Sequence, residues 1–164
     1  MGLKQALLIE VERETENTRK MISRIEDGHL AFKPHEKSMS MLALARHIVE
    51  LHSWVGEILS KDALDFHSGY TPLRPATVSE LLEALKVGYE HNIARLQEVN
   101  EEEWEQTWSL KAGAHTIASM PRKAAIRYIV QNHLIHHRGQ LSVYLRLNDI
   151  PVPGLYGPSA DDPR

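Results

Sequence analysis

Three histidines lie within five residues of the stretch NHLIHHRGQL, which covers residues 132–141. His133 and His137 are four positions apart, so on an α-helix their side chains stack on one face and point the same way. Two imidazoles in that arrangement can bind one metal ion. The spacing therefore indicates metal chemistry, provided that the stretch forms a helix.

A third histidine, in another helical segment, could complete the site. His47 lies on the apolar stripe of a helix that we predict over about 41–59. Metal sites in helical bundles are built from side chains on facing helices. Three neutral imidazoles would bind a divalent metal and leave at least one position open for water or substrate, as catalytic sites do. We therefore predict a metal site made of His47, His133 and His137.

The spacing alone also permits a second interpretation. A single histidine on an apolar face is more often a hydrogen-bonded core residue, and HxxxH is a short motif that occurs by chance. Three inward histidines without a metal would each need a protein partner, or each would cost about 1–3 kcal/mol in desolvation. A metal site and a set of polar core groups therefore both stay open.

A general base for such a site has to come from outside the histidine pair. No glutamate follows His133, so the sequence lacks the HExxH motif of zinc proteases. Glu14 lies on the inward stripe of the first predicted helix, and Glu50 lies one turn from His47. We name both as candidate bases, although a surface or salt-bridged carboxylate is the ordinary role of either.

Other residues could shape the surroundings of the pair. His136 points partly away from it, and we expect this side chain beside the site or at the surface. Arg138 could steer an anionic substrate, although a surface salt bridge is its more common role. The tryptophans could wall a pocket or pack in the core; they are Trp54, Trp104 and Trp108.

Four helical segments can position these residues. Three segments between or after these helices are irregular. The long connection 61–77 holds glycine and prolines, and the helical period is lost over 99–120. The segment 149–164 is rich in proline, so it cannot continue the last helix. We expect extended pieces in 99–120, which could form a lid, and an irregular C-terminal tail. Apolar residues recur every three or four positions over about 3–26, 41–59, 78–98 and 121–147.

Four amphipathic helices without a strong strand pattern bury their apolar faces best as an antiparallel bundle. We therefore predict an all-α fold, a four-helix bundle with long crossover connections. A chain of 164 residues suits one domain, and such a domain can bury roughly 70% of its unfolded surface. We accordingly assign a single domain to residues 1–164.

Composition narrows the classes of protein. With 42% hydrophobic and 25% charged residues and a formal net charge of -3, the chain resembles an ordinary globular protein. It has no basic run that would bind nucleic acid and no apolar stretch near the roughly 20 residues of a membrane span. We expect neither kind of partner, and a cytoplasmic location. Cysteine is absent, so any reacting thiol must come from a separate molecule.

Three stretches together resemble the DinB/YfiT-like superfamily of small helical bundles: SMSMLALARHIVELHSW, NHLIHHRGQLSVYLR and IPVPGLYGPSADD. The most specific element is HxxxHRGQ with one upstream histidine. The resemblance covers nearly the whole chain, and it implies a four-helix bundle, often a homodimer, with metal-binding histidines at His47, His133 and His137. Characterised relatives include thiol-dependent transferases that use mycothiol or bacillithiol, and hydrolase- or isomerase-like enzymes, while many members have no established activity.

Our leading hypothesis is a metal-dependent enzyme that acts on a small-molecule substrate, as a thiol-dependent transferase or a hydrolase-like enzyme. Zinc suits three imidazoles, with nickel, iron or manganese as alternatives, and a low-molecular-weight thiol could be a cofactor. The competing hypothesis is a non-catalytic helical stress or interaction protein whose metal supports the fold, and which unfolds on chelation. A helical dimer without metal is the third.

Overall fold

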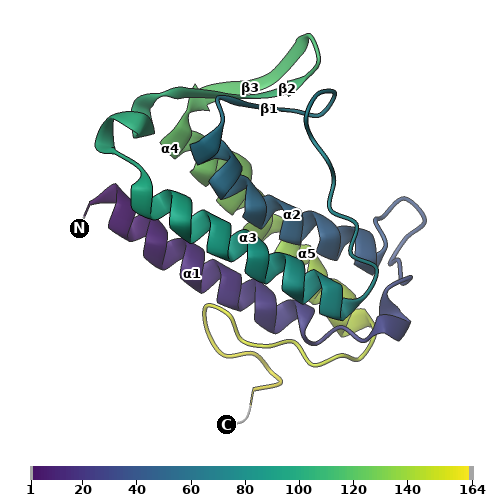
Figure 1. Ribbon diagram of the computed structural model, residues 1–164. Helices are drawn as coiled ribbons and strands as arrows, with labels where there is room; N and C mark the ends of the chain where they lie inside the picture. Colours follow the sequence, from purple (N-terminus) through teal and green to yellow (C-terminus); the bar gives the residue numbers. More distant parts are fainter. Residues whose placement is uncertain (1, 163–164) are drawn as a thin grey trace.

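Four long helices pack side by side in the computed structural model, which describes residues 2–162 (Figure 1). The helix α3 packs against both α1 and α2, and α5 packs against the other side of α2. The predicted helices over 41–59 and 78–98 are confirmed, whereas the first helix ends earlier than the predicted 3–26. The helices are α1 (Leu3–Ile22), α2 (Met41–Ser60), α3 (Val78–Glu98) and α5 (Asn132–Leu147).

Side-chain caps fix where the two middle helices begin. The Ser40 hydroxyl accepts a hydrogen bond from the amide of Ala43 at 3.1 Å. The Thr77 hydroxyl accepts one from the amide of Glu80 at 3.2 Å. Each cap satisfies one of the amides that the first helical turn leaves without a partner. The start of α2 sets the position of His47, six residues further on.

A small three-stranded sheet corrects the prediction of an all-α bundle. Strand β1 (Ala63–Asp65) pairs in parallel with β2 (Thr107–Ala112), which pairs antiparallel with β3 (His115–Pro121). Gly113, at a φ of 62°, makes the tight turn between β2 and β3. Periodicity could not show β1, because a strand of three residues has no pattern of its own and its partner is distant in sequence.

The sheet does not form a lid over the histidines. It lies at the end of the molecule where α2 ends (Figure 1), whereas His47 lies in the second turn of α2, near the opposite end. The buried side chains of β2 include Trp108, and Trp104 is buried just before it. Both tryptophans therefore pack in the core, and the segment 99–120 caps one end of the helices.

The helix that carries the histidine pair is interrupted, whereas we predicted one continuous helix over 121–147. It begins as the short α4 (Arg122–Ala125), continues as a π-helical turn, η3 (Ile126–Gln131), and only then becomes α5. In the π turn the amide of Asn132 bonds the carbonyl of Arg127, five residues back. A π turn holds one residue more than an α-helical turn, and such turns are frequent at functional sites.

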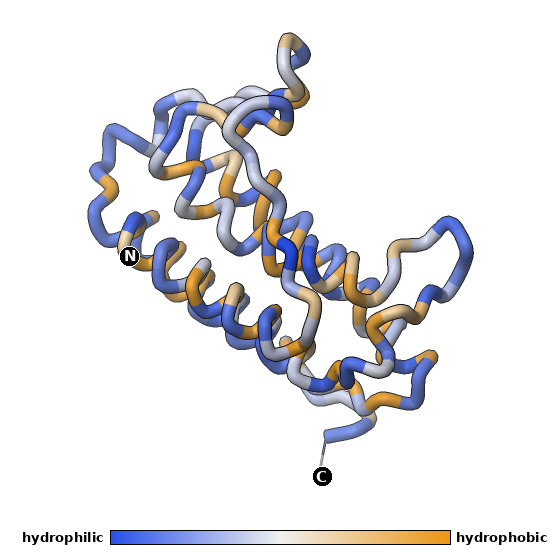
Figure 2. Tube along the Cα trace, turned by 45° about the vertical axis from the view of Figure 1, so that its right-hand side comes forward, coloured by the Kyte–Doolittle hydropathy of each residue, from blue (hydrophilic) through white to orange (hydrophobic). Residues whose placement is uncertain are grey.

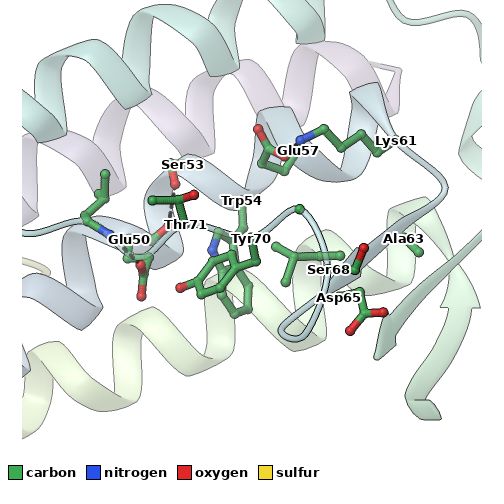
Figure 3. A pocket seen from close by; sticks show the side chains of 13 residues that line it. Glu50, Ser53, Trp54, Glu57, Lys61, Ala63, Asp65, Ser68, Tyr70 and Thr71 are labelled. Carbon is green, nitrogen blue, oxygen red and sulfur yellow. Dashed lines mark hydrogen bonds and ion pairs between the residues drawn. The ribbon is translucent and has the colours of Figure 1, made fainter. Parts of the chain in front are cut away.

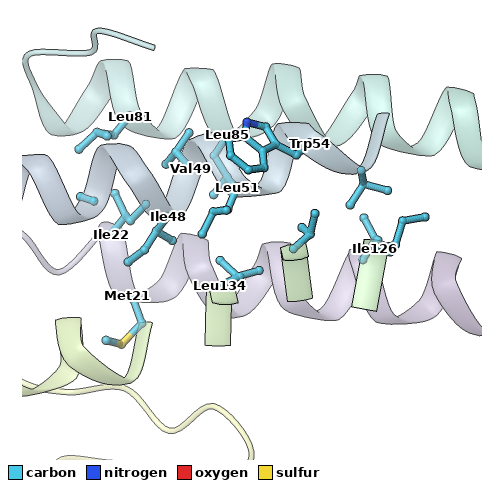
Figure 4. Close-up of a cluster of buried hydrophobic side chains, with 14 of the residues drawn as sticks. Met21, Ile22, Ile48, Val49, Leu51, Trp54, Leu81, Leu85, Ile126 and Leu134 are labelled. Atoms are coloured by element: carbon cyan, nitrogen blue, oxygen red, sulfur yellow. The ribbon is translucent and has the colours of Figure 1, made fainter. Parts of the chain in front are cut away.

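The hydrophobic core lies between the four long helices. Figure 4 shows Ile22 of α1, Leu51 of α2, Leu85 of α3 and Leu134 of α5 converging on it, and all four are buried. Along the helices, hydrophobic and hydrophilic residues alternate in the pattern of amphipathic elements (Figure 2). Burial of the core side of α2 and α5 holds the two helices at a fixed spacing, which the facing histidines require.

Two ion pairs anchor the segments that adjoin the helices. The buried guanidinium of Arg122 binds the carboxylate of Asp62, just after α2, at 2.7 Å. Arg146 binds Asp161 of the tail at 2.5 Å. Residues 149–162 contain no helix or strand, as predicted for the irregular tail over 149–164, whose last two residues lie outside the described part. Among residues 2–162, no helix combines the length and apolar character that crossing a bilayer requires.

Candidate metal centre

The structure brings together the three histidines that the sequence singles out. The Nε2 atom of His137 lies 2.8 Å from Nε2 of His133, and Nε2 of His47 lies 3.4 Å from Nε2 of His133. The three rings can each offer one nitrogen so that all three nitrogens lie within 4.8 Å of one another. Neighbouring helices thus direct three imidazole nitrogens at one point, and each side chain is half-buried.

These separations fit a shared divalent metal. Two nitrogens bound tetrahedrally at about 2.0–2.1 Å from zinc would lie roughly 3.3 Å apart. The distance between His47 and His133 already has this value, and the pair His133 and His137 would have to separate by about half an ångström, which a small ring rotation provides. All three residues therefore fit a metal, and three ligands leave at least one coordination position for a further one.

The electrostatics of the cluster favour neutral imidazoles. Burial, together with the neighbouring His137 and His133, lowers the pKa of His47 to about 4. Burial also lowers the pKa values of His133 and His137 below their ordinary value. At neutral pH each ring therefore has an unprotonated nitrogen that can bind a metal.

Hydrogen bonds orient two of the three rings. Nδ1 of His137 lies 2.7 Å from Oε1 of Gln140, one turn along α5, and donates to it. His133 likewise makes a hydrogen bond to the backbone of Ile129. When the outer nitrogen of a ring carries the proton, the inner nitrogen is free to bind a metal. We did not single out Gln140 from the sequence, although its spacing of three from His137 is a signal for such a contact.

His136 does not join the cluster. Its side chain is exposed, and its ring centroid lies 5.0 Å from that of His137. This position agrees with the expectation that His136 lies beside the site or at the surface.

Glu50 is the better placed of the two candidate bases. It is half-buried one turn from His47, and Figure 3 shows its carboxylate beside Tyr70. Its Oε1 accepts a hydrogen bond from the amide of Leu73 at 3.0 Å, and the Tyr70 hydroxyl donates to the same carboxylate. Burial and this contact raise the pKa of Tyr70. Sequence reasoning missed Tyr70, because it lies in an irregular connection with no pattern.

Glu14 lies in a different arrangement, together with Arg138. Arg138 is 1% exposed, so its expected place in a surface salt bridge is wrong. Its guanidinium forms an ion pair with Glu14 and hydrogen bonds at 3.0 Å to the Glu14 carbonyl and the Thr18 hydroxyl. Tyr156 of the tail donates to the same carboxylate at 2.8 Å. These contacts occupy the Glu14 carboxylate, and they keep Arg138 from steering a substrate.

Comparison with known sequences identifies relatives over the whole chain. The model of the DinB family matches residues 1–164. The Bacillus subtilis protein YjoA is 29% identical over 133 residues, which cover 79% of this chain and 80% of YjoA. YrdA of the same organism is 24% identical over 152 residues, which cover 92% of this chain and 86% of YrdA. Both relatives are named as uncharacterized proteins.

Solved structures show the same fold. A DinB-like protein from Bacillus cereus superposes with a TM-score of 0.71 at 21% identity, over 93% of this chain and 97% of its own. The structure of YjoA superposes with a TM-score of 0.69 at 21% identity, over 89% of this chain and 95% of the YjoA chain. A crystal structure of a protein from Exiguobacterium sibiricum, described as of the DinB family, superposes with a TM-score of 0.63 at 19% identity, over 91% of this chain and 94% of its own. Together with the family match, these structures confirm the resemblance found in the sequence.

Proposed function

The chain belongs to the DinB family, and we propose that it is a metal-dependent enzyme whose divalent metal is bound by His47, His133 and His137. The observation that supports this proposal is the convergence of three imidazole nitrogens, from two helices, within 4.8 Å of one another. Zinc suits this donor set best, and nickel, iron and manganese are the alternatives that a metal analysis would distinguish.

The proposed reaction is a transfer to an electrophilic small molecule from a thiol, or its hydrolysis by water. A bound divalent metal lowers the pKa of a thiol or water ligand, which supplies a nucleophile at neutral pH. Since the chain has no cysteine, the thiol would be a separate low-molecular-weight molecule. Three histidines leave at least one coordination position for it.

Within this proposal Glu50 accepts the proton that the thiol or water releases. Its carboxylate lies one turn from His47 and is held by the amide of Leu73 and the hydroxyl of Tyr70. Those two contacts fix the position of the carboxylate, and a fixed base within reach of the nucleophile is what general-base catalysis requires.

Elemental analysis tests the metal site directly. The tag-free protein would be purified without chelator or nickel resin, beside His47→Ala and His137→Ala, with His136→Ala as the matched control. We expect near one equivalent of a divalent metal in the parent and the control, and its loss in the other two variants. A folded parent that contains no metal and takes up no added zinc, nickel or manganese would contradict the proposal.

Turnover tests the catalytic part. A panel of thiols and electrophiles would be screened with the metal-loaded protein, with His137→Ala and with Glu50→Gln. We expect turnover that requires the metal and His137, and that falls in Glu50→Gln while the metal stays bound. The non-catalytic alternative predicts instead no turnover and an apo protein that unfolds on chelation, which circular dichroism would detect.

A further inference from the structure

A cavity of about 450 Å³ opens along α2, beginning one helical turn from His47 (Figure 3). One wall is α2 itself, and the other is the connection that follows it, over 63–73. None of the three histidines lines this cavity, which therefore suits the part of a substrate that does not react. Its charged and aromatic lining consists of Glu50, Trp54, Glu57, Lys61, Asp65 and Tyr70.

The rings of Trp54 and Tyr70 line this cavity. The ring centroids of Trp54 and Tyr70 lie 6.2 Å apart at 84°, and Phe66 packs against both, at 5.9 Å and 5.2 Å. The bond from the Tyr70 hydroxyl to Glu50 fixes the orientation of that ring. The face of an ordered aromatic ring attracts an organic cation, because the π-electrons give the face a negative potential and the edge a positive one.

The charged groups of the lining leave a negative excess. Lys61 pairs with Glu57 at 2.6 Å, so these two charges balance. Neither Glu50 nor Asp65 forms an ion pair among residues 2–162, although the nearby charge of Lys111 offsets part of that of Asp65. Oδ1 of Asp65 accepts hydrogen bonds from the amides of His67 and Gly113, at 2.9 and 2.8 Å, which fix the carboxylate in place. A ligand with a positive charge would be favoured here, and an anion disfavoured.

The indole of Trp54 supplies a donor without an acceptor. The Trp54 side chain is 4% exposed, its N–H makes no hydrogen bond to a protein atom within 2–162, and the nitrogen itself is open to solvent. In Figure 3 its nitrogen lies on the side of the ring that faces the cavity, toward Glu50 and Thr71. Water can reach this nitrogen, so a ligand that offers an acceptor at this point would replace a bound water with a direct hydrogen bond.

We infer that this cavity binds the substrate through a protonated amine, set against the aromatic wall and favoured by the negative charges of Glu50 and Asp65, which lie toward opposite ends of the cavity (Figure 3), and through a neutral acceptor oxygen that accepts from the Trp54 indole. The substrate class is then an amine that carries a hydroxyl or carbonyl group. This inference rests on the proposed function in assigning the cavity to the substrate of the histidine site, but the binding itself requires no metal.

Two probes of matched shape test the charge preference. 2-Amino-1-phenylethanol and 3-hydroxy-3-phenylpropionate share a phenyl ring and a hydroxyl, and they differ in ending in an ammonium or a carboxylate. Calorimetric titration would use the chelator-treated protein, with its fold checked by circular dichroism, or the zinc-loaded protein if chelation unfolds it. We expect the cation to bind about three- to fivefold more tightly than the anion.

Three variants connect the preference to the lining. Asp65→Asn and Glu50→Gln keep the acceptor oxygens but remove the charge, so each should reduce the preference for the cation. Trp54→Phe removes the indole N–H, so it should weaken both probes by a similar factor. Glu83→Gln, on the exposed face of α3, is the matched control and should change neither affinity.

Equal affinities for the two probes, or no binding of either, would overturn the inference. A preference that Glu50→Gln and Asp65→Asn leave unchanged would also overturn it. None of these results would affect the proposed function, since the metal content of the parent and of His137→Ala is measured separately. A variant that has lost the metal but stays folded should in turn bind the cation as the parent does.

Discussion

Adjacent residues of α5 belong to two polar clusters of opposite character. His137 faces α2, where three half-buried imidazoles point their nitrogens at one another. Arg138 faces α1, where a fully buried guanidinium binds the carboxylate and carbonyl of Glu14 and the hydroxyl of Thr18. His52 joins this second cluster, with Nε2 2.8 Å from the Thr18 hydroxyl.

The difference lies in how completely each cluster satisfies its own polar atoms. In the arginine cluster, which consists of Glu14, Thr18, His52, Arg138 and Tyr156, donors meet acceptors and a cation meets an anion. In the histidine cluster the inner nitrogens face other nitrogens, which can neither neutralise nor fully satisfy them. A cluster whose polar atoms all have partners stabilises the fold, whereas a cluster whose atoms lack partners is stabilised when a ligand binds it.

The largest effect is expected from breaking the arginine cluster. Arg138→Leu leaves the Glu14 carboxylate buried without its cation, so the free energy of unfolding should fall by about 3–5 kcal/mol. Urea titration measures it. The double variant Arg138→Leu with Glu14→Gln should recover part of the loss. If Arg138→Leu costs less than about 1 kcal/mol, as an exposed pair would, the cluster is not a structural one.

Added zinc should stabilise the protein through the histidine cluster. At a free zinc concentration one hundred times its Kd, the free energy of unfolding should rise by about 2.7 kcal/mol. Thermal unfolding in the presence and absence of zinc measures the change. His137→Ala should show no such gain, while its stability without zinc stays near that of the parent. An equal gain in both proteins would place the zinc elsewhere.

A variant of Gln140 tests whether its hydrogen bond to His137 orients that ring for metal binding. Gln140→Leu removes the acceptor for Nδ1 of His137, so the metal affinity should fall about 10- to 100-fold with all three ligands intact. Competition with a metal-binding dye measures the affinity. Gln5→Leu, on the exposed side of α1, is the control and should have no effect. An unchanged affinity in Gln140→Leu would show that packing alone orients the ring.

The last effect concerns pH and the arginine cluster. Burial, together with the charge of Arg138, lowers the pKa of His52 to about 3. The unfolded chain takes up a proton on this residue near pH 6.5 and the folded chain does not. Stability should therefore be full above pH 6.5 and decrease as the pH falls, by at most about 1.4 kcal/mol per pH unit.

His52→Gln is the variant for this pH test, since it can still bond Thr18 but does not titrate. Urea titrations between pH 7 and pH 4.5 should show a shallower fall in stability for His52→Gln than for the parent. Parallel curves for the two proteins would show that His52 does not contribute to the pH dependence.

The sequence predicted the histidine cluster because its residues follow simple helical rules. The spacing of four between His133 and His137, and the place of His47 on an apolar stripe, suffice to bring the three rings together once two helices face each other. That they bind a metal stays a prediction until it is measured, as do the homodimer and the single domain over 1–164.

The parts that the sequence did not predict depend on long-range or irregular contacts. Strand β1 exists only because β2, some 40 residues later, pairs with it. Tyr70 comes to Glu50 from an aperiodic connection. Arg138 was expected at the surface because arginine usually lies there, but the burial of a cation depends on its partner, Glu14, which lies on another helix. Local patterns carry no information on such pairings.

The π turn makes the histidine helix tolerant of changes in length. It holds one residue more than an α-helix needs, while α4 before it stays anchored through Arg122 and α5 after it keeps its histidines toward α2. Deleting the exposed Tyr128 would therefore regularise the helix and leave both ends facing as they do now. A relative whose aligned sequence lacks one residue within 126–131 would therefore keep the same site, with its three histidines in the same places.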